Sequence, residues 1–86
     1  MKIRYEFVKR EIAGETFLVP IGEAAKEYSG LFALNELGAF IWERLPDAEN
    51  EQAVVDAVLE EYDVSPEQTA EDVSEFFTKL RDMKII

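Results

Sequence analysis

Apolar and polar residues alternate at the start of the chain. Between residues 3 and 8 every second residue is apolar, which is the period of a β-strand with one buried face. In the segment that follows, Ala13-Gly14 predicts a tight turn, because glycine adopts positive φ at little cost. Residues 16–19 form the predicted return strand, and Pro20 ends it because proline cannot donate to a strand ladder. The pattern predicts an antiparallel hairpin.

A third strand is predicted further along. The connecting residues 21–30 are mostly polar and allow one short helical turn. They are followed by a short apolar run that leads directly into a helical pattern, and this run is Leu31, Phe32, Ala33 and Leu34.

The spacing of apolar residues then changes to that of amphipathic helices. Asn35 is a favourable N-cap for a first helix, and Pro46 ends that helix. A second helix is predicted to begin near Asn50, with apolar residues recurring every three or four positions.

The third helix has the clearest start signal. Ser65 is the predicted N-cap, Pro66 occupies the first helical position, and Gln68 completes a capping box. The helical pattern continues to about Met83, which makes this helix the longest of the three.

The order of elements predicts one domain that spans residues 1–86. Three short strands cannot be stable alone, so the helices must cover one face of the sheet. We therefore predict an α+β, winged-helix-like fold with three N-terminal antiparallel strands followed by three α-helices.

Composition excludes several kinds of chemistry. The chain of 86 residues has no Cys and no His, which excludes thiol chemistry, disulfides, Cys/His zinc sites and imidazole base catalysis. No apolar run is long enough for a transmembrane helix or the core of a signal peptide, so we expect a cytoplasmic protein.

The acidic residues do not predict a catalytic or metal site. The neighbouring pairs Glu60-Glu61 and Glu71-Asp72 lie in amphipathic patterns whose polar positions face water. The acidic segment 56–63 lacks the ligand spacing of a calcium loop. We expect a non-catalytic protein with no metal and no cofactor.

The negative charge is concentrated in the second half. The formal net charge is −10, and residues 45–78 contain eleven acids and no base. Such a segment repels phosphate groups, so neither nucleic acid nor an anionic membrane is an expected partner. A third helix that carries Glu67, Glu71, Asp72 and Glu75 is unsuited to reading DNA. The acidity fits either a solvated surface or the attraction of a basic partner segment.

A peptide-binding edge is one of two interpretations of the third strand. An edge strand can accept an extended peptide, whereas a core strand is simply buried. Phe76 and Phe77 point about 100° apart on a helix. If Phe77 joins the core, Phe76 lies beside Lys79 and Met83 next to the strand. Alternatively, Phe76 only widens the core.

Several segments together resemble the PqqD-like family. They are the step Leu34-Asn35, the run from Gly38 to Trp42, and the line Asp72-Val73, Phe76 and Leu80. The resemblance implies a small winged-helix domain that recognises the leader segment of ribosomally made, post-translationally modified peptides. Such domains present the precursor peptide to a modifying enzyme, commonly a radical S-adenosylmethionine protein. No residue identifies pyrroloquinoline quinone, the product of the namesake pathway, as the product here.

The resemblance also implies a peptide site and partners. The leader adds as a strand to the third strand and packs against the third helix, whereas Gly38 and Trp42 serve packing. The expected partners are a precursor leader peptide and a modifying enzyme, and the chain is expected to be a monomer or a weak homodimer. The alternative is a winged-helix scaffold or dimerisation module without leader binding. The implied peptide-binding residues are Leu31, Phe32, Ala33, Leu34, Asp72, Val73, Phe76, Lys79, Leu80 and Met83.

Overall fold

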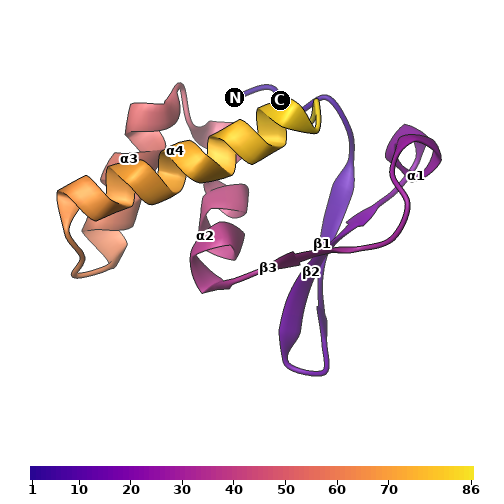
Figure 1. The fold of residues 1–86 in the computed structure, drawn as a ribbon, viewed down its shortest axis with the longest axis horizontal. Helices are drawn as coiled ribbons and strands as arrows, with labels where there is room; N and C mark the ends of the chain where they lie inside the picture. Colours follow the sequence, from indigo (N-terminus) through magenta and orange to yellow (C-terminus); the bar gives the residue numbers. More distant parts are fainter.

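Three antiparallel strands and the helices that follow them make up the fold, as predicted (Figure 1). The computed structural model describes all 86 residues. The three predicted helices are α2, α3 and α4, and a short additional helix, α1, occupies the segment that allowed one helical turn. The elements are β1 (Phe7–Ile12), β2 (Glu15–Pro20), α1 (Glu23–Glu27), β3 (Phe32–Leu34), α2 (Glu36–Arg44), a 3-10 turn (Leu45–Asp47), α3 (Glu51–Glu61) and α4 (Pro66–Asp82).

The hairpin of β1 and β2 turns at the predicted residues. Ala13 and Gly14 both have positive φ, 52° and 82°, as a two-residue hairpin turn requires. This turn pairs Ile12 with Glu15 and so assigns residues 7–12 to the partner strand of β2. The strand predicted at residues 3–8 is therefore wrong by about four residues.

Residues before β1 have a different partner. The backbone N–H of Arg4 donates to the carbonyl of Ile85 at 2.7 Å, which joins the N-terminal segment to the chain after α4. The part-buried side chains of Met1 and Ile3 pack against the core. The alternation in this segment therefore records burial without strand pairing.

Strand β3 lies at the edge of the sheet. The strand order is β1-β2-β3, and β3 pairs only with β2, where Leu34 lies opposite Thr16 and Phe32 opposite Leu18. β3 begins one residue later than predicted, because Leu31 lies outside the strand and is 49% exposed. The second edge of β3 is free.

The two predicted N-caps, Asn35 and Ser65, are confirmed, and the second helix begins after a cap at Asn50, near the predicted start. The side chains of Asn35, Asn50 and Ser65 each accept a hydrogen bond from the backbone N–H three residues later, at 2.7, 2.9 and 3.3 Å. The predicted capping box at Ser65 is only half formed, because the side-chain amide of Gln68 donates to Asp72 at 2.9 Å.

The hydrophobic core lies between the helices and one face of the sheet (Figure 1). β2 contributes Leu18, and the other buried residues come from α2, α3, α4 and the segments that follow α2 and α4. None of the helices combines the length and the apolar run needed to cross a lipid bilayer. The buried cluster consists of Leu18, Ile41, Trp42, Leu45, Val54, Val55, Val58, Val73, Phe77, Leu80 and Ile85.

An aromatic cluster holds β3 in place. The ring of Phe32 makes edge contacts with Phe7 and Tyr28, with centroids 5.9 and 5.8 Å apart. Phe7 in turn contacts Trp42 of α2 at 5.8 Å. The hydroxyl of Tyr28 donates to the carbonyl of Met83, and partial burial raises the pKa of this phenol. These contacts position β3 relative to α2 and the end of α4.

Candidate functional site

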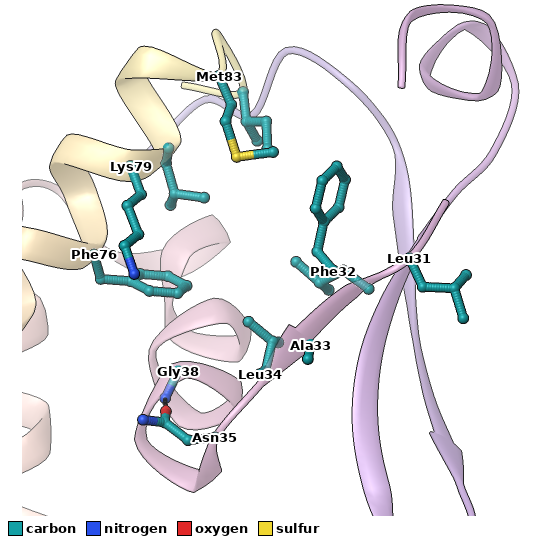
Figure 2. Close-up of a pocket in the computed structure, with 12 residues that line it drawn as sticks. Leu31, Phe32, Ala33, Leu34, Asn35, Gly38, Phe76, Lys79 and Met83 are labelled. Carbon is teal, nitrogen blue, oxygen red and sulfur yellow. Dashed lines mark hydrogen bonds between the residues drawn. The ribbon is translucent and has the colours of Figure 1, made fainter. Parts of the chain in front are cut away.

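A groove separates β3 from α4 (Figure 2). Its volume is about 420 Å³, and nine of the twelve residues that line it are hydrophobic, so an apolar ligand surface fits it best. The lining residues are Leu18, Leu31, Phe32, Ala33, Leu34, Asn35, Gly38, Phe76, Lys79, Leu80, Met83 and Ile85.

One wall of the groove is the free edge of β3. Figure 2 shows Phe32 and Leu34 pointing toward the α4 side, whereas Ala33 points the other way. Leu31 lies at the rim. The free edge of a strand offers backbone N–H and C=O groups at intervals that match a second strand.

The other wall is one face of α4. Phe76, Lys79 and Met83 follow one another at intervals of three and four residues, which places them along one side of the helix. Phe77 is fully buried in the core while Phe76 lines the groove, which is the first of the two arrangements that the sequence left open. The Lys79 ammonium forms no ion pair within 4 Å, and it is the only charged group in the groove lining.

The floor of the groove comes from residues distant in the sequence. Leu80 is the one floor residue that the sequence predicted, and it is buried, with an exposed fraction of 4%. Leu18 and Ile85 were missed, because Leu18 lies in the predicted hairpin and Ile85 lies beyond the predicted end of the third helix. Lys84 has a positive φ of 62°, and after this turn Ile85 folds back under α4.

Gly38 lets α2 and α4 approach each other at the inner end of the groove. A Cβ atom there would lie 3.1 Å from the side-chain oxygen of Asn35 and 3.4 Å from atoms of Leu34 and Phe76. The Asn35 oxygen accepts from the Gly38 N–H at 2.7 Å, which leaves the side-chain NH₂ of Asn35 without a partner in the protein. That group is available to donate to a ligand.

A polar recess continues the groove past Phe76. Its volume is about 220 Å³, and it shares Asn35, Gly38, Phe76 and Lys79 with the apolar groove. The recess adds the carboxylates of Asp72 and Glu75.

Two of the predicted site residues do not line the apolar groove. Asp72 lines the recess and not the apolar groove. Val73 is fully buried in the core and lines neither, so it cannot touch a ligand in this conformation. The remaining eight predicted residues are brought together around the groove.

Comparison with known families identifies the kind of domain that carries this groove. Residues 15–86 match the family described as Coenzyme PQQ synthesis protein D (PqqD). The chain belongs to the PqqD family. The match begins at the first residue of β2 and includes both walls of the groove, so the site is part of the PqqD domain.

A solved structure shares the PqqD-family fold of this chain. It is TbiB1 in complex with the TbiA(beta) leader peptide, with a TM-score of 0.71 and 26% sequence identity. The match covers 99% of this chain and 93% of that chain, so the hairpin, β3 and all helices have counterparts there. No curated protein matches the sequence.

Proposed function

We propose that this PqqD-family chain binds the leader segment of a ribosomally made precursor peptide by strand addition to β3. The observation that carries the proposal is the free edge of β3, which forms one wall of an apolar groove. The similar structure of TbiB1 with a bound leader peptide supports it. The chain acts as a non-catalytic peptide chaperone, and the delivered precursor is modified by a separate enzyme.

The two walls contribute different parts of recognition. Backbone hydrogen bonds along β3 give the register of the peptide, and they are independent of its side chains. Alternate side chains of an added strand face α4, where Phe76 and Met83 offer an aromatic and a flexible apolar surface. Because a disordered leader loses entropy on binding, the expected dissociation constant is micromolar to sub-micromolar.

The size of the groove supports the delivery role. The strand β3 has three residues and a length of about 10 Å, so it can pair with about three residues of an added strand. The rest of a precursor peptide would remain outside the domain and accessible to an enzyme. A radical S-adenosylmethionine enzyme as the recipient, and a cytoplasmic location, follow from the family resemblance and the sequence.

Amide NMR titration with the leader of a precursor encoded beside this protein tests the proposal. Shifts are expected at residues 31–34 and along the groove face of α4. Trp42 is only 8% exposed and does not line the groove, so its fluorescence would report binding only through Phe7 and Phe32. A fluorophore on the peptide is therefore the better optical probe.

N-methylation of successive peptide amides tests the strand geometry. Only every second amide of an added strand faces β3, so alternate N-methyl groups should weaken binding. Equal effects at all positions would contradict strand addition. The alternative is that the edge of β3 serves dimerisation. It would hold if no leader binds, if sedimentation shows concentration-dependent association of the chain, and if a substitution in β3 abolishes that association.

A further inference from the structure

The groove and the recess form one channel with an apolar segment and an acidic segment. They share the four residues Asn35, Gly38, Phe76 and Lys79, so a peptide that passes Phe76 enters the recess. Along α4 the order of groups is Met83, Lys79, Phe76 and then Asp72 with Glu75 beside it. A ligand along this channel meets apolar surface first and carboxylates last.

The two carboxylates of the recess have no cationic partner in the protein. The three ion pairs of the structure use other acids, namely Glu43, Glu23 and Glu51. Asp72 accepts a hydrogen bond from the side-chain amide of Gln68 at 2.9 Å, which orients the carboxylate without neutralising it. Asp72 also lines a separate neighbouring cavity together with Glu36, so a third acid lies near this end of the channel.

Lys79 makes the electrostatic preference depend on position. Its side chain lines both the groove and the recess, at the junction between them, and its ammonium would repel a cationic side chain there. Asp72 lies seven residues away on α4, about 10 Å along the helix axis. A basic residue is therefore disfavoured over the middle of the groove and favoured only beyond Phe76.

We propose that the channel selects an extended peptide with two apolar residues at alternate positions and a Lys or Arg two positions beyond them. The spacing follows from the geometry of the elements. Phe76 and Met83 are about 10 Å apart along α4, and side chains at positions i and i+2 of a strand are about 7 Å apart, so both apolar side chains of such a pair fit between the two anchors. Asp72 lies about 6 Å further, which is about two strand residues, so the cation belongs on the same face of the peptide.

The orientation of the peptide determines the side on which the cation lies. β3 runs from Phe32 toward Asn35 and thus toward the acidic end. A peptide antiparallel to β3 would carry the cation on the N-terminal side of the apolar pair, and a parallel one on the C-terminal side. The inference rests on the proposed function and specifies the leader peptide that this groove accepts.

Selection from a displayed library of random linear peptides tests the inference without knowledge of the precursor. The wild-type chain, F76A, D72N/E75Q and E60Q/E71Q are used as baits. The variant E60Q/E71Q is a matched control, because it also removes two negative charges, but from exposed positions that line neither the groove nor the recess. Circular dichroism verifies that each bait is folded.

On the wild-type chain and on E60Q/E71Q, the enriched peptides should share the apolar pair and a cation on one constant side. On D72N/E75Q the apolar pair should persist and the cation should disappear. For one selected peptide, D72N/E75Q should weaken affinity by about 2- to 30-fold, the range that two partly exposed ion pairs give.

Two negative outcomes are distinguishable. Selected peptides that need Phe76 but show no positional cation, or show the same cation on D72N/E75Q, would overturn this inference and leave the proposed function intact. If no selected peptide loses binding on F76A, the groove does not bind peptides and the proposed function itself fails.

Discussion

Two adjacent phenylalanines on α4 have separate roles. Phe76 lines the groove and is half-buried, whereas Phe77 is fully buried in the core. Phe76→Ala should weaken peptide binding by about 1–3 kcal/mol, because it removes an aromatic anchor, and leave folding intact. Phe77→Ala should lower the free energy of unfolding by about 3–5 kcal/mol, because it leaves a cavity in the core. Titration calorimetry and urea unfolding measure the two effects.

The two variants serve as controls for each other, since they remove the same side chain one residue apart. The assignment of the two faces would be wrong if both variants unfolded at the same urea concentration and bound the peptide equally well.

Gly38 leaves room for the Phe76 ring to extend toward α2. In Gly38→Ala, the helix-propensity gain of about 1 kcal/mol is opposed by the approach of Cβ to the Asn35 oxygen, so stability should change little. The methyl group also meets the Phe76 ring and should move it into the groove, which should weaken peptide binding several-fold. Thermal unfolding and a peptide titration measure both quantities. Unchanged affinity together with raised stability would show that the ring has room to adjust.

At the scale of elements, turn geometry determined the position of β1 more strongly than alternation did. Ala13-Gly14 was identified from the sequence, and a two-residue turn allows only one pairing, that of residues 7–12 with 15–20. The alternation at residues 3–8 is also real, but it arises from packing of the N-terminal segment beside Ile85. Periodicity reports a buried face and does not identify the partner that buries it.

The same distinction separates the predicted and missed parts of the groove. Phe76, Lys79 and Met83 were predictable, because helix spacing places them on one face. Leu18 and Ile85 were not, because the folding back of the chain at Lys84 and the position of the sheet bring them under α4. The family resemblance implies that Val73 contacts the peptide, although its burial follows from the same helical stripe as Phe77.

The start of α4 depends on Ser65. Its hydroxyl accepts from the Gln68 N–H at 3.3 Å and donates to the Glu67 carboxylate at 3.0 Å. Ser65→Ala should therefore cost about 0.5–2 kcal/mol of stability at neutral pH. Ser74→Ala, an exposed Ser→Ala change in the middle of α4, should be neutral or slightly stabilising and is the matched control.

The cost of Ser65→Ala should also depend on pH. The pKa of Glu67 is lowered from 4.5 by hydrogen bonds from its own backbone N–H and from the Ser65 hydroxyl. A carboxyl pKa that is lower in the folded state stabilises the fold above the ordinary pKa, and this contribution is lost as pH falls through the lowered value. Urea unfolding at neutral and acidic pH should show a smaller difference between wild type and Ser65→Ala in acid. A pH-independent difference would contradict a role for Glu67 in the cap.

At the scale of the whole molecule, negative charge and the peptide channel lie at different but adjoining places. The segment with eleven acids includes α3 and most of α4, whereas the apolar groove has a single charged group, Lys79. Only the recess combines acids of this segment, Asp72 and Glu75, with the lining of the channel. The general field of the chain should therefore attract a basic peptide from a distance, and the two recess carboxylates should hold it after arrival.

Stopped-flow kinetics with a basic-flanked peptide can separate these two effects. The association rate should fall as salt rises, because the net charge of −10 is screened beyond about 10 Å at 0.1 M ionic strength. D72N/E75Q and E60Q/E71Q remove the same net charge, so they should slow association to a similar, small extent. Only D72N/E75Q should shorten the lifetime of the complex, by about 2- to 30-fold, because only the recess acids contact the peptide cation. Equal lifetimes for the two variants would mean that the acidity acts at long range alone, and that the recess selects no residue.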